Sequence, residues 1–371
     1  MQHSFEIERA PFLAAIKRVV GAVESRSTLP ILSYVKVDIL LRGVAILSAS
    51  DLEVFATSEC PVEIKEGHGC SFCVPAKKIQ GAVAVIPDEK IILGYNDEQK
   101  VSISGDGLRY SFDILGTDEF PVPVSNDESL LVEFSPGALG RMINSVIHAV
   151  SRDDTKYNLG GINIFYEDGS QQFTMAATDG HRLSVVGLKN FPGVDVLKKS
   201  TILPFKAAGM IAKIVGTVSL SADSNTFVAD SPGINIAAKF IDGEFPEFRR
   251  VIPNNNDLMI AVNRSKLIEA LVAVGVVEEK SRCITLVREC DQLEVRALGD
   301  SAICTATINC EGDDGLRFSV SSKFLLQALR ALDGEDVLIK YNNDDCRSVA
   351  IYQAAPGGWD ERVEVIMGMR E

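Results

Sequence analysis

The chain repeats itself three times, and this repetition constrains its fold more than any other feature. Amphipathic helical segments recur at intervals of 127 and 128 residues; they start at Glu8, Ser135 and Asn263. A second kind of segment, a short apolar strand leading into a helix with an early lysine, recurs around Val74, Leu203 and Val320. Two independent markers with nearly the same period predict three copies of one structural unit.

Between these helices the sequence alternates with period two around Gly- and Asp-rich turns, which is typical of β-hairpins. Each unit therefore reads as helix, strands, helix, strands, with mostly antiparallel sheets. Turn-rich polar stretches at 123–130 and 252–258 mark the boundaries. We predict an α+β fold with three domains, 1–125, 126–253 and 254–371, each large enough for its own core.

Charge is distributed unevenly over these elements. The chain carries −14 overall, whereas six helical windows together carry +10 and leave −24 for the remainder. Lys and Arg are good helix formers and could simply lie on solvated faces. The near-absence of acidic residues on the same helices instead favours a common surface facing a polyanion, with the acidic remainder repelling nucleic acid elsewhere. Without an Arg-rich recognition helix or an aromatic array, sequence-specific readout is not expected.

Targeting and metal-binding signals are weak. The longest apolar run, 270–277, falls far short of the ~18 residues of a membrane helix, and the first residues do not resemble a signal peptide. We expect a soluble, cytoplasmic protein that does not associate with membranes. The eight cysteines are expected to be buried and structural; Cys70 and Cys73 form a C-x-x-C without the second pair that a zinc site needs.

Common catalytic motifs are missing as well. The chain contains no P-loop, no H-E-x-x-H and no G-x-S-x-G. The stretch from Thr178 to Arg182 gathers an acid, an imidazole and a cation, yet Asp-Gly between apolar strands indicates a turn. We favour a protein that encloses a polyanion without catalysis. A hydrolytic site at Asp179 and His181 and an interaction scaffold that binds no DNA remain open.

Several stretches resemble the β subunit of bacterial DNA polymerase III, the replicative sliding clamp. They are 27–32 (STLPIL), 74–78 (VPAKK), the EFP at Glu119, 177–185 (ATDGHRLSV), the run at 242–253 (DGEFPEFRRVIP) and 367–370 (MGMR). The resemblance implies a non-catalytic processivity factor without cofactor or metal, in a ring-shaped head-to-tail homodimer around double-stranded DNA. It also implies partners that dock through short peptides: the polymerase III α subunit, the clamp-loader δ subunit, other DNA polymerases, and mismatch-repair or ligase proteins.

The same resemblance assigns site residues. The DNA-facing set is Arg26, Lys77, Lys78, Arg152, Tyr157, Lys206 and Lys213. The partner-peptide pocket is Leu159, Thr178, Gly180, His181, Arg182, Leu183, Pro246, Arg250, Val251, Cys346, Ser348, Val365, Met367 and Met369. The dimer contacts are Tyr110 and Phe112 on an edge strand of one chain and Val276 and Val277 on the other. Asp153, Cys346 and Gly368 depart from the family pattern.

Overall fold

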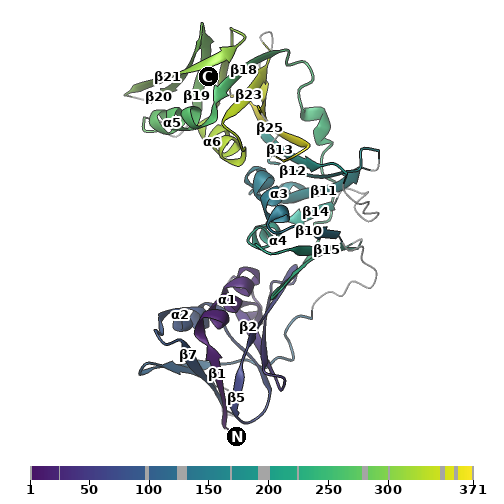
Figure 1. The fold of residues 1–371 in the computed structure, drawn as a ribbon, viewed down its shortest axis with the longest axis vertical. Helices are drawn as coiled ribbons and strands as arrows, with labels where there is room; N and C mark the ends of the chain where they lie inside the picture. Colours follow the sequence, from purple (N-terminus) through teal and green to yellow (C-terminus); the bar gives the residue numbers. More distant parts are fainter. Residues whose placement is uncertain are drawn as a thin grey trace. The chain divides into compact units, whose positions relative to one another are not determined.

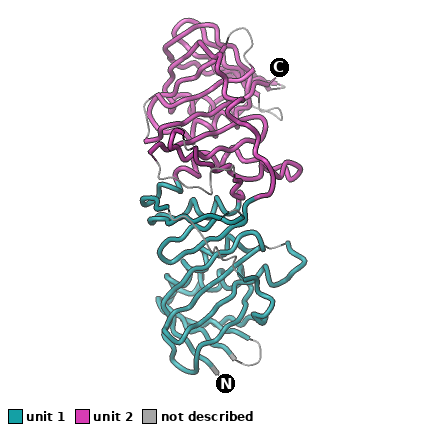
Figure 2. Tube along the Cα trace, turned by 90° about the vertical axis from the view of Figure 1, so that its right-hand side faces the viewer, with its two compact units in different colours: residues 1–140, 206–240 teal, residues 141–205, 241–371 magenta. Residues whose placement is uncertain are grey.

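The computed structural model describes residues 2–24, 26–96, 100–122, 132–167, 169–190, 201–223, 225–277, 283–299, 301–342, 347–354 and 358–369 (Figure 1). The chain forms two compact units, 1–140 with 206–240 and 141–205 with 241–371 (Figure 2). Within the described ranges, no helix is both long and apolar enough to cross a membrane.

The described residues form six α-helices, at the places that the repeats predict. They are α1 (Arg9–Val19), α2 (Ala76–Val85), α3 (Ala138–Val146), α4 (Phe205–Ile211), α5 (Arg264–Val274) and α6 (Ser322–Ala331). In α1 the buried positions Phe12, Ala15, Ile16 and Val19 follow the spacing of one apolar helix face. Glu269 in α5 is the single acidic residue within the bounds of these six helices.

The unit of 1–140 and 206–240 contains two antiparallel sheets. The first has the order β5-β1-β7-β8-β9 and the second the order β10-β15-β16-β17-β4-β3-β2-β6. Their strands are β1 (Gln2–Glu8), β2 (Tyr34–Leu40), β3 (Val44–Ser50), β4 (Val54–Pro61), β5 (Glu63–Glu66), β6 (Cys70–Pro75), β7 (Lys90–Asn96), β8 (Lys100–Gly105), β9 (Leu108–Asp113), β10 (Val132–Phe134), β15 (Val218–Ala222), β16 (Thr226–Ser231) and β17 (Ile234–Lys239).

The other unit has one twelve-stranded sheet of the order β14-β11-β12-β13-β25-β24-β23-β18-β21-β20-β19-β22. Its strands are β11 (Gly161–Glu167), β12 (Gln172–Thr178), β13 (Arg182–Leu188), β14 (Thr201–Pro204), β18 (Leu258–Asn263), β19 (Cys283–Glu289), β20 (Gln292–Leu298), β21 (Ile303–Gly312), β22 (Arg317–Ser321), β23 (Asp336–Tyr341), β24 (Ser348–Gln353) and β25 (Glu361–Met367).

The three repeats are joined by two equivalent strand pairs. In chain order β4, β13 and β21 hold the same place in their repeats, and so do β9, β17 and β25. β17 pairs with β4, and β25 pairs with β13. We call these pairs the first and second junctions. Each compact unit contains one junction, so the boundary between the two units falls within the middle repeat. The three-domain boundaries stay a prediction.

Among the described residues no disulfide bond joins the cysteines. Burial raises the pKa of Cys60, Cys70 and Cys73 to about 12, so these thiols stay protonated and unreactive at neutral pH. The expectation of burial is confirmed for Cys60, Cys73 and Cys310, whereas Cys70, Cys283 and Cys304 are only half-buried. It is wrong for Cys290, which is exposed in the turn between β19 and β20 with φ of 51°.

Candidate peptide groove and DNA-facing residues

The second junction has an apolar face built from the residues that flank the paired strands. Leu183 on β13 lies opposite Val365 on β25, and Ala350 on β24 lies opposite Val365 on its other side. These side chains belong to one cluster with Leu159, Ala176, Val185, Ile202, Phe245, Phe248 and Val363. Three of the predicted pocket residues belong to this cluster: Leu159, Leu183 and Val365. In the sequence, Pro246 follows Phe245 of the cluster, and Val251 precedes Ile252, which packs against it.

A tight turn closes one end of this face. Asp179 Oδ1 accepts hydrogen bonds from the backbone N–H groups of His181 (3.0 Å) and Arg182 (3.2 Å). Thr178 Oγ1 accepts one from Gly180 N at 3.1 Å and donates one to Arg182 O at 2.6 Å. Gly180 has φ of 91°, a conformation that glycine adopts without strain. The predicted turn is confirmed, and it leaves the His181 side chain exposed.

Arg182 lies on the opposite face of the sheet from Leu183, because successive side chains of a strand alternate. Its guanidinium donates to Asp179 Oδ2 at 3.0 Å, to Gln327 Oε1 at 2.6 Å and to the carbonyl of His148, and it lies 4.4 Å from the centre of the Phe324 ring. Its donors face α6 and the segment before β11. Arg182 therefore fixes the turn from behind and does not line the apolar face.

Next to Arg182 lies a buried ionic cluster. Glu364 on β25 accepts hydrogen bonds from Arg362 Nη2 (2.5 Å) and Ser184 Oγ (2.8 Å), and lies 3.2 Å from His148 Nε2. Burial opposes ionisation of Glu364, but Arg362 and His148 outweigh it and lower its pKa. The cluster holds β13 and β25 together on the side away from the apolar face.

The end of the chain continues the second junction beyond its last strand pair. Met367 N donates to His181 O at 2.9 Å, Gly368 N to Arg347 O at 2.7 Å and Met369 N to Ser319 O at 2.7 Å. The side chains of Met367 and Met369 are 43% and 40% exposed. The backbone is thus fixed while two flexible apolar side chains remain available. Ser348 pairs with Met367, and Cys346 lies outside the described residues.

The run Glu244–Val251 forms another wall. Phe245 and Phe248 are buried, while Pro246, Arg250 and Val251 are exposed. Beside them lies a cavity of about 560 Å³ that Phe165, Phe248 and Arg249 help to line. Arg249 pairs with Glu361 at 3.1 Å and lies 5.6 Å from the Phe248 ring. Sequence reasoning missed Arg249; the neighbouring aromatic residues Phe245 and Phe248 are the signal that could have indicated it.

We use the name C-terminal groove for the predicted pocket residues at the second junction: Leu159, Leu183, Pro246, Val251, Val365, Met367 and Met369. Leu183 and Val365 are buried beneath the surface, whereas Pro246, Val251, Met367 and Met369 are exposed. The arrangement suits an extended chain with apolar side chains, since methionine adapts to different partners.

Most of the predicted DNA-facing residues are exposed. Lys77 and Lys78 begin α2, both are exposed, and neither makes an ion pair or hydrogen bond with a described residue. Arg26, Lys213 and Tyr157 are exposed too. The Arg152 guanidinium lies 3.2 Å from the centre of the Phe205 ring. Next to it, hydrogen bonds from Thr155 lower the pKa of Asp153, so this loop carries a carboxylate beside the cation.

Lys206 is one of the predicted DNA-facing residues, but its ammonium group is bound within the protein. Its ammonium donates to the carbonyls of Ala22 and Val23 at 3.0 and 3.1 Å and to Asp51 Oδ2 at 2.6 Å. An ammonium has three N–H donors, and here the protein itself uses all three. Lys206 joins α4 to the end of the first-repeat helix and is not available for a phosphate in this structure.

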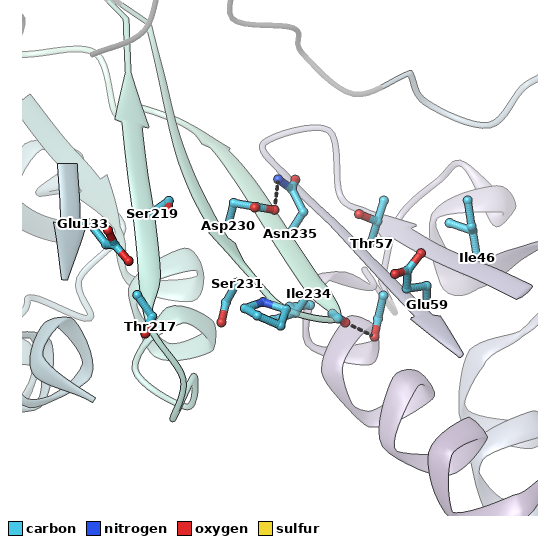
Figure 3. Close-up of a pocket in the computed structure, with 13 residues that line it drawn as sticks. Ile46, Thr57, Glu59, Glu133, Thr217, Ser219, Asp230, Ser231, Ile234 and Asn235 are labelled. Atoms are coloured by element: carbon cyan, nitrogen blue, oxygen red, sulfur yellow. Dashed lines mark hydrogen bonds between the residues drawn. The ribbon is translucent and has the colours of Figure 1, made fainter. Parts of the chain in front are cut away.

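The eight-stranded sheet of the same unit carries an acidic trough. Its volume is about 620 Å³, it crosses β3, β4, β10, β15, β16 and β17, and its lining includes Glu59, Glu133 and Asp230 together with small polar and some apolar residues (Figure 3). None of its lining residues is Lys or Arg. Repulsion between these carboxylates and phosphates makes this face unsuitable for nucleic acid.

Of the predicted dimer residues, Val276 is exposed, Tyr110 and Val277 are half-buried and Phe112 is buried. β9 is an edge strand, as predicted, and the rings of Tyr110 and Phe112 stack on it at 6.4 Å. α5 ends at Val274, so Val276 and Val277 follow the helix and do not end it. Val276 is 84% exposed, whereas Val277 packs against the core.

No group of three or more His, Cys, Asp or Glu suited to a metal ion occurs among the described residues. The carboxylate of Asp179 is held by its own turn and by Arg182, and no hydrogen bond in the described structure joins it to the His181 ring. The geometry therefore gives no support to a hydrolytic pair at this turn.

Three joined α+β repeats, whose described helices hold a single acidic residue, define a clamp-type fold. Models of the DNA polymerase III beta subunit match residues 3–124 (N-terminal domain) and 133–247 (central domain). Since these two models together match well over half of the chain, it belongs to the bacterial DNA polymerase III β-subunit family, the sliding clamps that make the replicative polymerase processive.

Individual relatives agree with this. The chain is 28% identical over 375 residues to the beta sliding clamp of Pseudomonas putida, with 99% of each chain covered. It is 26% identical to that of Caulobacter vibrioides, covering 95% of this chain and 96% of the relative. A crystal structure of the Bartonella birtlesii sliding clamp bound to griselimycin covers 100% of both chains with a TM-score of 0.90 and 26% identity.

Proposed function

We propose that two copies of this chain close head to tail into a non-catalytic ring around double-stranded DNA. The observation that carries this proposal is that two strands, β9 and β21, take part in neither junction. β17 pairs with β4 and β25 with β13, whereas their equivalents β9 and β21 have no such partner in the described chain. Pairing β9 of one copy with β21 of the other makes a third junction of the same kind, and two such contacts close a ring.

The exposed residues at the β21 edge support this pairing. β21 contacts β18 only through Cys310–Gly312, which leaves the backbone of its first part open on that side. Ile303 at the start of β21 is 70% exposed, and Leu298 on the adjacent strand β20 is 59% exposed. An open edge with exposed apolar side chains is a place for strand pairing. The proposed contacts are made by Tyr110 and Phe112 on β9 and by Val276 and Val277 beside β21.

Inside the ring, basic side chains and one tyrosine contact the phosphates and sugars of the duplex. These residues are Arg26, Lys77, Lys78, Arg152, Tyr157 and Lys213. Such contacts are independent of sequence and permit sliding, because no base is recognised. The acidic trough of Figure 3 then belongs to a surface that turns away from DNA.

The C-terminal groove takes short extended peptides of the polymerase α subunit, the clamp-loader δ subunit, other polymerases and repair or ligase proteins. Its apolar floor holds their anchors, and Met367 and Met369 adjust to differences between them. Exchanging Met367 for alanine removes one rim side chain while its backbone bond to His181 persists. Calorimetry with acetyl-Gly-Leu-Ser-Leu-Phe-amide should show roughly tenfold or greater loss of affinity, with the dimer mass unchanged by light scattering. Unchanged affinity contradicts the groove.

Topology provides the decisive test of the ring. After loading onto nicked circular DNA, the protein should co-elute with the circles at salt concentrations that abolish ordinary phosphate contacts. Linearising the same DNA should release it. Equal retention on circular and linear DNA contradicts enclosure. A protein that binds neither form, yet still binds peptides, favours the scaffold without DNA.

A further inference from the structure

The first junction has the same backbone geometry as the second. Lys239 N donates to Glu53 O at 2.9 Å, as Met367 N does to His181 O at 2.9 Å. Two residues earlier Ala237 lies opposite Phe55, as Val365 lies opposite Leu183. Position by position, the strands that form the floor of the C-terminal groove therefore have counterparts in β4 and β17.

The surroundings correspond as well. Asp51 Oδ1 accepts hydrogen bonds from Glu53 N (3.0 Å) and Val54 N (2.6 Å), and Ser50 Oγ accepts one from Leu52 N (3.0 Å). Asp179 and Thr178 do the same in the other turn. The tripeptide Glu-Phe-Pro at 119–121 recurs at 244–246, and Phe120 packs edge-on against Phe55 at 6.3 Å.

These elements enclose an open cavity of about 440 Å³, the first-junction groove. Its lining residues are Ser50, Leu52, Glu53, Phe55, Pro121, Val122, Ala237, Ala238 and Lys239. Phe55 and Ala237 are buried in its floor and continue into a core cluster with Phe120. Val122 on the rim is 84% exposed. The groove thus offers an apolar floor and, on its rim, the exposed apolar side chain of Val122.

Leu52 is an unusual residue for its place in this groove. Its φ of 80° lies in the left-handed region, where its counterpart Gly180 has 91°. A leucine is strained there and a glycine is not. The side chain is 47% exposed, so burial in the core does not compensate for the strain. Strain that packing does not repay commonly marks a functional position.

The charges of the two grooves differ. Lys239 stands where Met367 stands in the C-terminal groove, and it lies 3.7 Å from Glu53. The Glu53 side chain is 62% exposed and that of Lys239 43%. An exposed ion pair of this length stabilises the protein little. A carboxylate bound in the groove can therefore replace Glu53 as the partner of Lys239.

We propose that the first-junction groove is a second docking site, which takes an extended segment of a partner protein with an apolar anchor and an acidic side chain. The anchor packs over Phe55, Pro121 and Ala237 against Leu52, and the carboxylate pairs with Lys239. The choice of a peptide as occupant rests on the proposed C-terminal groove; the acidic residue follows from Lys239.

The test uses the full-length chain carrying Met367→Ala, which weakens the C-terminal groove, so that binding in the first-junction groove is recognised by its response to changes at Leu52 and Lys239. Calorimetry with acetyl-Gly-Leu-Glu-Leu-Phe-amide should detect binding to this chain, and the peptide with lysine in place of glutamate should bind less well. Adding Leu52→Gly should weaken binding about tenfold without lowering the melting temperature, since glycine relieves the strain. Adding Lys239→Met should abolish the preference for glutamate.

Three outcomes overturn the proposal: no binding to the Met367→Ala chain, binding that Leu52→Gly leaves unchanged, or binding that appears only when 123–131 is replaced by Gly and Ser. In the last case the occupant is this chain's own segment. The two grooves can fail separately. Affinity lost on Met367→Ala reports on the C-terminal groove, and affinity lost on adding Leu52→Gly reports on the first-junction groove.

Discussion

Replacing Lys77 and Lys78 by glutamine is expected to reduce the salt dependence of DNA binding by a calculable amount. Both ammonium groups are exposed on α2 and neither has a partner among the described residues, so each is free to neutralise one phosphate. Each phosphate contact contributes about 0.9 to the slope of log K against log salt. The double variant should therefore lose about 1.8 from the slope.

The corresponding change in affinity is large enough to measure. Between 50 and 200 mM salt, two phosphate contacts account for about a 12-fold loss of affinity. The wild-type chain should show that additional loss and the double variant should not. Fluorescence anisotropy of a labelled linear duplex, titrated at several salt concentrations, gives the slope directly.

The chain offers a matched control in Lys65 and Lys90. Both are lysines of the sheet region, and both pair with Glu6, at 3.5 and 2.5 Å. Changing these two to glutamine alters the net charge by the same amount without removing a phosphate contact. If the control changes the slope as much as the α2 variant does, overall charge and not a defined surface controls binding, and the assignment of α2 to the DNA face is refuted.

Two further predictions concern the groups that hold the junctions. Glu364→Gln leaves Arg362 buried without a counter-charge and should lower the free energy of unfolding by about 3–5 kcal/mol. Because the folded pKa of Glu364 is lowered, its contribution to stability is complete above the unfolded value of about 4.3 and is lost as pH falls through the folded pKa. Denaturant titrations should therefore show the difference between variant and wild type shrinking below about pH 4, and a difference that is constant with pH argues against an ionised Glu364. Lys206→Met should lower the free energy of unfolding by about 1–3 kcal/mol, because Asp51 loses its cation, while the salt slope of DNA binding stays at the wild-type value; a reduced slope assigns Lys206 to the DNA after all.

The sequence determined the repeat, the six helices and the hairpins, because these follow from local patterns. The period of the apolar residues marks α1 and α5, and Asp-Gly or Gly-rich turns mark hairpins such as β12–β13 and β8–β9. The excess of basic residues on the helices was also visible, since it needs only a count. The family resemblance added the groove residues, yet it could not separate Leu183, on the groove floor, from Arg182, which faces the helices behind it.

Tertiary structure decided which of those residues are available. Lys206 looks like any exposed helical lysine in the sequence, and only the positions of Ala22, Val23 and Asp51, at least 155 residues away, show that its donors are used. The joining of repeats through β4–β17 and β13–β25 is likewise a long-range pairing that no local pattern encodes. Local periodicity fixes what each segment becomes, whereas contacts between distant segments fix which surfaces and charges remain free to bind.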